Sequence, residues 1–263
     1  MGEHSQNKGS VNVIREGALA TIVLARPRFH NALTWEMYEQ LGTLLEQIAT
    51  DDSVHVVVLR GAGGQAFAAG TDITQFEEFD AEAGVLYEQK IGHIIESLLK
   101  LPKPTIAAVE GYAVGGGLAL AAACDLRYAN ESAQFGVPVA RTLGNCLALR
   151  TSQRLIALLG QSRFLELVYV ARLIGSREAY QAGLVQQVFT NAEFEERLSA
   201  VLTMILGNAP LTLWAAKMAV LRLTSPSQDG AFDDVVRRVY GSEDFREGVS
   251  AYRLKKKPNW TGR

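Results

Sequence analysis

The sequence predicts an α/β protein in which strands and helices alternate over most of the chain. Short runs of β-branched and small residues, such as 54–60 and 105–109, are each followed by a stretch with helical character. This alternation is typical of a sheet whose strands are joined by crossover helices. From about residue 191 onward the pattern changes to helices alone. We therefore expect a core at residues 1–190 and a helical region at residues 191–263.

A β-hairpin and a capped helix are expected first. The runs 11–14 and 18–24 lie on either side of Glu16-Gly17. Thr34 is placed to cap a helix that ends near residue 50, because threonine oxygens accept the free N–H groups of a helix start. The same patterns give the other elements, which are strands at 54–60, 105–109, 125–129, 134–135 and 184–189 and helices at 81–101, 147–160, 161–171, 176–182, 192–207, 211–223, 229–240 and 243–254.

Composition describes an ordinary globular chain and argues against several classes of function. The 263 residues are 48% hydrophobic and 21% charged, which suits one large domain or a domain with an appendage. A net charge of −2 gives no basic footprint for nucleic acid. The four histidines are scattered without metal-ligand spacing, and no P-loop or dinucleotide fingerprint occurs. We therefore expect no metal, no separate cofactor and no nucleic-acid partner.

Cysteine usage and the first residues favour a cytoplasmic location. Cys124 and Cys146 do not make a disulfide framework, and Cys124 is expected to be a small buried residue. The first ten residues are polar and lack the apolar region of a signal peptide. Residues 106–124 are apolar enough to suggest a membrane span, but Glu110 and four glycines within them argue against it. We expect no membrane partner.

Three consecutive glycines mark the first candidate site. Gly115, Gly116 and Gly117 follow the strand at 105–109 and begin a helix of small residues. Backbone without Cβ atoms turns sharply and approaches a ligand closely. The first N–H groups of a helix have no intrahelical partner and lie at the positive end of its dipole. A carbonyl oxygen that gains negative charge is stabilised in such a place.

A second segment has the same character. AFAAGTDI, at 66–73, follows the strand at 54–60 and a glycine-rich loop at 61–64. Either segment alone is typical of tight packing. Together, and each after a predicted strand, they are placed to direct two backbone N–H groups at one oxygen.

These and other motifs resemble the crotonase, or enoyl-CoA hydratase/isomerase, superfamily. The similar segments are RPRFHNAL (26–33), AFAAGTDI (66–73), PTIAAVEGYAVGGG (104–117), ACDLRYA (123–129), AQFGVP (133–138) and AGLV (182–185). The resemblance implies a spiral of ββα turns. It also implies that an acyl-CoA thioester carbonyl lies between the backbone N–H groups of Thr71 and Gly116, which would form the oxyanion hole. Coenzyme A would then be part of the substrate.

Two positions depart from the hydratase pattern. The family's hydratases carry one glutamate two residues after the glycine triplet and another directly after the proline of the FG-x-P segment. Here these positions hold Ala119 and Val139, and neither can transfer a proton. Hydration of a double bond needs an acid/base pair that delivers water. We therefore expect plain enoyl-CoA hydratase activity to be absent or very low.

Residues that take over the role of the missing glutamates are expected in PVARTLGN, at 138–145, which the resemblance places along the acyl pocket. Arg141 is suited to hold a substrate carboxylate, and Asn145 to orient a water or a carbonyl. Surface or loop-stapling roles are the alternatives for both. Cys146 is either a nucleophile or a small core residue, and no histidine lies near it in sequence to activate it.

Further charged residues have two interpretations each. Glu78, Glu88 and His93 lie on or before one long predicted helix, which the resemblance places beside the acyl chain, but such a helix also carries solvated charges. Asp72 either caps the next helix or acts in catalysis. Glu110 is either a buried paired carboxylate or a loop-facing charge.

The resemblance also implies binding residues and an oligomer. Residues expected near the thioester and the acyl group are Ala66, Phe67, Ala69, Asp72, Ile73, Gly115, Pro138 and Val139. Arg28 and the cluster Lys255, Lys256 and Lys257 are expected near CoA phosphates, the cluster reaching a neighbouring subunit's CoA unless it is only a solubilising tail. The C-terminal helices either build a homotrimer or a dimer of trimers, or they cap their own core.

Two functions are compatible with these features. The first is an enzyme that stabilises a thioester enolate and works as an isomerase, decarboxylase, hydrolase or lyase. The second is an acyl-CoA-binding protein that has lost catalysis. Turnover on a panel of acyl-CoA esters distinguishes the two.

Overall fold

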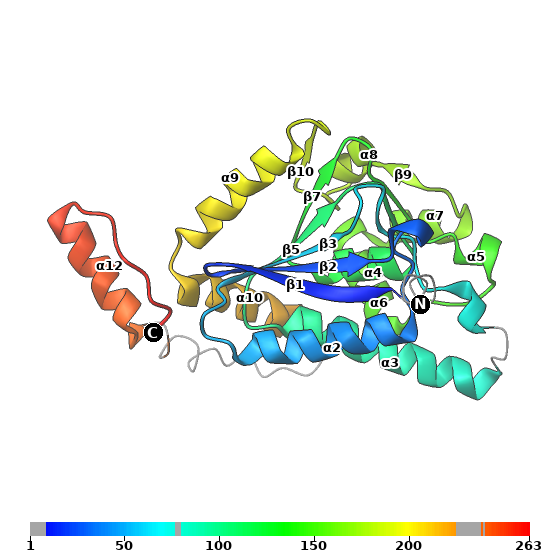
Figure 1. Ribbon diagram of the computed structural model, residues 1–263, viewed down its shortest axis with the longest axis horizontal. Helices are drawn as coiled ribbons and strands as arrows, with labels where there is room; N and C mark the ends of the chain where they lie inside the picture. Colours follow the sequence, from blue (N-terminus) through cyan, green and yellow to red (C-terminus); the bar gives the residue numbers. More distant parts are fainter. Residues whose placement is uncertain (1–8, 77–79, 225–237, 239) are drawn as a thin grey trace, which may run out of the picture.

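Two β-sheets form the centre of the protein in a computed structural model that describes residues 9–76, 80–224, 238 and 240–263 (Figure 1). The larger sheet contains, in spatial order, β1 (Ser10–Glu16), β2 (Leu19–Ala25), β3 (Val56–Gly61), β5 (Thr105–Val109), β7 (Leu126–Asn130) and β10 (Gln187–Phe189). The smaller sheet contains β4 (Ala66–Ala68), β6 (Tyr112–Val114), β8 (Gln134–Gly136) and β9 (Ile174–Gly175). The hairpin β1–β2 is antiparallel, as predicted.

The chain alternates between the two sheets. β3 is followed by β4, β5 by β6 and β7 by β8, and strands of successive turns pair in parallel within each sheet. Helix α3 (Ala81–Lys100) follows the first of these pairs and α4 (Gly116–Ala123) follows the second. This repeat of two strands and a helix is the predicted spiral of ββα turns.

Further helices cover the sheets and follow the spiral. They are η1 (Pro27–Phe29), α2 (Trp35–Thr50), η2 (Ile73–Phe76), α5 (Val139–Thr142), α6 (Leu149–Leu159), α7 (Gln161–Tyr169), α8 (Ser176–Gln181), α9 (Phe194–Leu206), α10 (Pro210–Thr224) and α12 (Glu243–Leu254). Thr34 caps α2 as predicted, because its Oγ1 accepts the N–H of Met37 at 3.3 Å. α2 and α3 pack against each other along the face of the large sheet (Figure 1).

Most predicted elements are present with shifted ends, but three short strands were missed. β4, β6 and β9 have two or three residues each, too few to show an alternating pattern. The strand expected at 184–189 is shorter, because only Gln187–Phe189 pairs with β7. The helix expected at 229–240 lies outside the described residues, except for 238 and 240, which are helical.

Buried groups fix the end of α4. Cys124 is buried, as expected, and burial raises the pKa of its thiol to about 12. Arg127 is also buried, and its guanidinium donates to the carbonyl oxygens of Cys124 and Leu184 at 2.6 Å each. These bonds satisfy the free carbonyl at the end of the helix and join it to the segment before β10.

The C-terminal helices are joined to the core through both α9 and α10, and Phe194, Leu198 and Leu202 of α9 are buried against β3 and β5. Lys217 is buried and pairs with Asp125 at 3.0 Å, while its ammonium also donates to the carbonyl of Lys103 at 3.0 Å. Leu211 on the same helix is buried and Trp214 is half-buried, so part of its apolar face packs on its own chain. In contrast, α12 projects away from the sheets (Figure 1).

No single helix in the described part of the chain is long and apolar enough to cross a membrane. α9 and α10 reach that length and composition only as a pair, with a bend of 97° between them.

Candidate active site

The first amide of the candidate site belongs to Thr71, between β4 and η2. Leu33 forms a parallel bridge to it, in which the N–H of Leu33 donates to Gly70 O at 2.8 Å and the N–H of Asp72 donates to Leu33 O at 2.9 Å. In this pattern the N–H of the middle residue points away from the bridge. Among the described residues, the Thr71 N–H has no protein acceptor. It is therefore available to a ligand.

Gly116 provides the second amide. It is the first residue of α4, so its N–H has no partner within the helix. The amide before it, of Gly115, already donates to Gly136 O at 2.9 Å. A Cβ built on Gly116 would lie 3.7 Å from the Thr71 nitrogen, and one built on Gly70 would lie 3.9 Å from the Gly116 nitrogen, so the two free amides lie close together. A helix start and a second N–H together can stabilise an oxyanion.

The neighbouring glycines are needed for this arrangement. A Cβ on Gly117 would lie 2.0 Å from the carbonyl oxygen of Ala68, so only glycine lets α4 start this close to β4. Gly115 has a φ of 53°, in the left-handed region that favours glycine. The glycine triplet therefore sets both the position and the direction of the Gly116 N–H.

A chain of three hydroxyl groups lies beside the amides. Thr71 Oγ1 is 2.9 Å from Tyr38 Oη of α2 and 2.9 Å from Tyr87 Oη of α3. Tyr38 is fully buried, and burial, with the nearby Tyr87 and Glu88 adding to it, raises its pKa far above the ordinary value. Burial raises the pKa of Tyr87 to about 12. Both tyrosines are therefore neutral near pH 7, and they hold the Thr71 segment between two helices.

A groove of about 910 Å³ begins at Tyr87 and runs between α3 and residues 143–150. Its volume is within the range of small-molecule sites. Apolar side chains dominate its walls, and they include Phe76, Val85, Tyr87, Leu143, Leu147 and Leu149. The groove lies where the resemblance places an acyl chain.

Three polar residues of the groove were singled out from the sequence. Burial raises the pKa of Glu88, and a backbone hydrogen bond from Ala148 acts in the opposite direction. The Oδ1 atom of Asn145 is buried and lacks a hydrogen-bond partner within the described residues. Cys146 is exposed, so its interpretation as a small core residue was wrong. Its segment is a loop at the surface and not a helix packed on the core.

Other charged candidates lie outside the groove. Arg141 is exposed on α5 and His93 is exposed on α3. Glu110 pairs with Arg60 at 2.8 Å and is half-buried, which matches the paired-carboxylate alternative. Glu78 lies outside the described residues.

Asp72 has a structural role that fits the capping interpretation. Its Oδ1 accepts the N–H of Thr74 at 3.2 Å and the Thr74 hydroxyl at 2.9 Å, at the start of η2. Its Oδ2 pairs with Arg26 at 2.7 Å. Although burial opposes them, these contacts lower the pKa of Asp72. The carboxylate thus ties the Thr71 segment to the turn after β2.

The predicted binding residues near the thioester differ in exposure. The side chains of Ala66 and Phe67 are buried in β4, so only their backbone can face a ligand. Ala69 and Ile73 are exposed on either side of Thr71. Gly115, Pro138 and Val139 are half-buried, the last two at the start of α5.

The basic residues expected near CoA phosphates lie in two places. Arg28 is exposed on η1, and the N–H of Ala69 donates to His30 O at 3.0 Å, which holds that turn beside the end of β4. Lys255, Lys256 and Lys257 are exposed just after α12, the helix that projects from the sheets (Figure 1).

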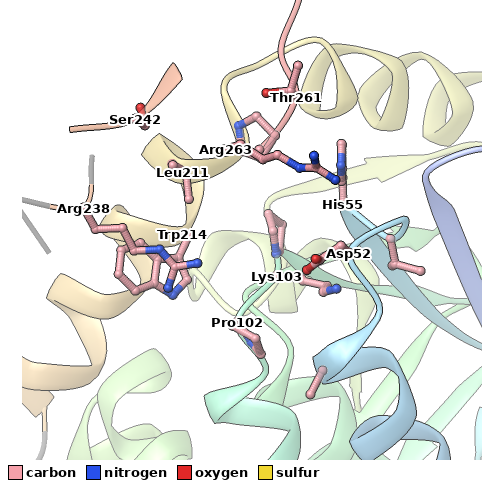
Figure 2. A pocket seen from close by; sticks show the side chains of 15 residues that line it. Asp52, His55, Pro102, Lys103, Leu211, Trp214, Arg238, Ser242, Thr261 and Arg263 are labelled. Atoms are coloured by element: carbon pink, nitrogen blue, oxygen red, sulfur yellow. The ribbon is translucent and has the colours of Figure 1, made fainter. Parts of the chain in front are cut away.

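A second cavity, of about 420 Å³, lies at the opposite end of the large sheet (Figure 2). Its lining includes His55 and Lys103, which precede β3 and β5, together with α10 and the last residues of the chain. The guanidinium of Arg238 stacks 4.4 Å over the ring of Trp214 at its edge (Figure 2). The free amides instead follow the carboxyl ends of these strands, so this cavity is not part of the candidate site.

The family follows from comparison with known proteins. The sequence profile described as enoyl-CoA hydratase/isomerase matches residues 15–263. The chain belongs to the enoyl-CoA hydratase/isomerase family. The chain is therefore a member of an enzyme family with an acyl-CoA substrate, and its two free amides fit this assignment. The match also confirms the predicted crotonase-like fold.

Relatives in this family cover the chain almost completely. The chain is 35% identical over 254 residues to a 2,3-dehydroadipyl-CoA hydratase of Escherichia coli, covering 95% of this chain and 98% of that protein. It is 32% identical over 251 residues to a short-chain-enoyl-CoA hydratase of Clostridium acetobutylicum, covering 94% and 96%. The crystal structure of an enoyl-CoA hydratase/carnithine racemase from Magnetospirillum magneticum superposes with a TM-score of 0.92 at 34% identity, covering 97% and 98%.

Sequence reasoning missed Tyr38 and Tyr87. Tyr38 lies on the buried stripe of α2 with Met37 and Leu41, so it reads as an ordinary core residue. The available signal was chemical, because a tyrosine on a buried face needs a partner for its hydroxyl. Thr71 is that partner for both rings.

Proposed function

We propose that this enzyme binds an acyl-CoA thioester with its carbonyl oxygen between the N–H groups of Thr71 and Gly116, and stabilises the enolate of that thioester. The observation that carries the proposal is the pair of amides without protein acceptors, which meet at one space beside a groove. Each donor of such a pair contributes about 3 kcal/mol to a charged transition state.

The proposed reaction is not simple hydration of an enoyl-CoA. Ala119 lies buried on α4 and Val139 lies at the start of α5, and neither side chain can act as an acid or a base. Isomerisation, decarboxylation, hydrolysis and retro-aldol cleavage all pass through a stabilised oxyanion without needing that glutamate pair. Hydration of crotonyl-CoA should therefore be at least about 10²–10⁴-fold slower than in an ordinary hydratase, the usual cost of a missing acid or base.

One experiment tests the function most directly. The protein is incubated in D₂O with a mixture of acyl-CoA esters, and mass spectrometry identifies which are retained, which change and which gain deuterium. Retention together with deuterium at the α-carbon supports enolate stabilisation. Failure to retain any ester would contradict the proposed site.

The alternative is an acyl-CoA-binding protein without catalysis, which Ala119 and Val139 favour. It predicts that esters are retained at the same amides but recovered unchanged and without deuterium. The same experiment therefore separates the two functions.

We also propose a homotrimer or a dimer of trimers, in the cytoplasm, with no cofactor besides the CoA of the substrate. Support comes from α12, which projects from the sheets (Figure 1), and from Trp214, which is only half-buried. Light scattering at micromolar concentration measures the assembly, and a monomer would contradict it. Activity that survives dialysis against a chelator would support the absence of a metal.

A further inference from the structure

The groove beside Tyr87 contains few groups that can move a proton. Among the described residues that line it, the titratable side chains are those of Asp80, Tyr87, Glu88, Cys146 and Arg150. Asp80 is occupied as the N-cap of α3, accepting the N–H of Ala83 at 2.8 Å. Arg150 is paired with Glu96 at 3.6 Å. The Tyr87 hydroxyl is bonded to Thr71 and titrates only near pH 12.

Glu88 differs from Asp80, Tyr87 and Arg150 because its surroundings leave it open to a ligand. Gly84 and Gly92 lie one helical turn before it and one turn after it, on the same face of α3. All three residues line the groove, and a Cβ on either glycine would meet nothing within 4 Å. The two glycines therefore leave free space on both sides of the Glu88 side chain.

Glu88 also acts electrostatically on the hydroxyl chain that lies beside the free amides. It follows Tyr87, whose hydroxyl is 2.9 Å from Thr71 Oγ1. Burial is the main reason that the pKa values of Tyr87 and Tyr38 are raised, and the negative charge of Glu88 raises both further. The carboxylate thus acts electrostatically on the hydroxyl chain that holds the Thr71 segment.

We propose that the Glu88 carboxylate is the base that removes the α-proton of the acyl-CoA bound at Thr71 and Gly116, a role that rests on the function proposed above. In this step the Cα–H bond breaks and the proton passes to a Glu88 oxygen. The electron pair of that bond forms the enolate double bond, and the carbonyl pair moves to the oxygen held by the two amides. Reversal from protonated Glu88, after exchange with water, returns a proton to the substrate.

The environment of Glu88 suits this task. A carboxylate that is partly withdrawn from water is a stronger base than an exposed one, since burial disfavours its charge. Burial raises the pKa of Glu88, and the hydrogen bond from the N–H of Ala148 acts in the opposite direction. The titratable groups that line the same groove are Asp80 and Tyr87 of the α3 region, Cys146 of the loop and Arg150 of α6, and the Glu88 charge also acts on Tyr38 of α2.

The test measures exchange of the α-protons of butyryl-CoA in D₂O by NMR, with binding measured separately by calorimetry. Glu88→Gln should lower the exchange rate about 10²–10⁴-fold, the usual contribution of a positioned base, while the Kd for butyryl-CoA stays within a few-fold. The control is Glu82→Gln, which changes an exposed glutamate of the same helix outside the groove. It should exchange at the parent rate.

Two further variants keep the test informative. Glu88→Ala should regain part of the exchange rate when formate is added, because a small carboxylate fits the space that the side chain vacates. Gly92→Leu fills the open space beside Glu88 without changing the carboxylate, and should also slow exchange. The parent rate should rise with pH to a plateau, and Glu88→Gln should lack this rise.

The outcomes separate the two proposals. Exchange by Glu88→Gln at the parent rate, with normal binding, would overturn the role of Glu88 and leave the amide site standing. Binding without any exchange by the parent protein would contradict both the enolate function and the base.

Discussion

The two sides of the candidate active site are made from different parts of the polypeptide. On one side, the amides of Thr71 and Gly116 belong to backbone that fully buried residues such as Phe67 and Leu118 hold in place. On the other side, the groove is walled by side chains of α3 and of residues 143–150, and several of them, such as Leu149 at 85% exposure, are in water. One side is fixed by the core and the other is not.

This difference teaches how one fold can serve several reactions. Activation of a thioester carbonyl needs only two N–H groups, and the packing of β4 against α4 supplies them whatever the side chains of the groove are. The choice of acyl group and the proton transfer depend on side chains that can change without disturbing the core. Under the proposed function, the chain would keep the amides of Thr71 and Gly116 for carbonyl binding while it carries Ala119 and Val139.

The largest expected effect belongs to the buried side. Gly117→Ala would place a Cβ 2.0 Å from the carbonyl oxygen of Ala68, and backbone at both positions leaves little room to move. We expect a loss of more than about 4 kcal/mol in the free energy of unfolding, an exceptional value for one substitution. Urea unfolding measures it. The matched control is Gly42→Ala in α2, whose new Cβ would lie 4.0 Å from Ile94 and should be tolerated.

Gly116→Val should remove acyl-CoA binding. Its Cβ would lie 2.7 Å from the Tyr38 hydroxyl and 3.7 Å from the Thr71 nitrogen, in the space proposed for the thioester oxygen. Calorimetry with butyryl-CoA should detect no binding. The double variant Gly116→Val with Tyr38→Phe relieves the contact with the hydroxyl, so it should recover stability without recovering binding. Tight binding by either variant would place the thioester elsewhere.

The amide side was predictable from sequence because its signals are local. The glycine triplet and AFAAGTDI are short segments, and a strand before each already implies the direction of the chain. The groove was not predictable in the same way. Glu88 and Asn145 come from distant segments, and each had both a functional and a surface interpretation until the fold placed them along one cavity. The hydroxyl chain was missed for the same reason, since Tyr38 and Tyr87 meet only at Thr71.

Substitutions at Thr71 distinguish the role of its backbone amide from that of its side-chain hydroxyl. Thr71→Ala keeps the amide but leaves the buried Tyr38 hydroxyl without its Thr71 partner, which costs about 1–3 kcal/mol of stability. Deuterium exchange into butyryl-CoA should be reduced only slightly. Thr71→Ser keeps the hydroxyl and should restore most of the stability. A loss of exchange as large as that of Glu88→Gln would show that the Thr71 hydroxyl itself takes part in the reaction.

The pH dependence of the free energy of unfolding tests the environment of Glu88 on the groove side of the site. Burial raises its pKa in the folded protein, so the folded state binds more protons than the unfolded state between the two pKa values. Stability therefore falls as pH rises through that interval. Glu88→Gln removes this loss and should be more stable than the parent near neutral pH. The difference should vanish below the ordinary glutamate pKa of about 4.3, and Glu82→Gln, at an exposed glutamate of the same helix, is the matched control.

The smallest expected effect lies outside both sides of the site. Replacing Lys255, Lys256 and Lys257 with alanine should weaken CoA binding only slightly, because exposed ion pairs contribute about 0.2–1 kcal/mol each and are screened by salt. α12 projects from the sheets (Figure 1), so these lysines would contact the CoA of another subunit. Their effect should disappear at protein concentrations low enough to dissociate the oligomer.

Arg28, on the turn beside β4, should act within its own subunit, so the effect of Arg28→Ala should persist on dilution. Calorimetry at low and high salt, with both variants diluted in parallel, measures the two. A lysine effect that survived dissociation would mean that α12 folds back over its own active site.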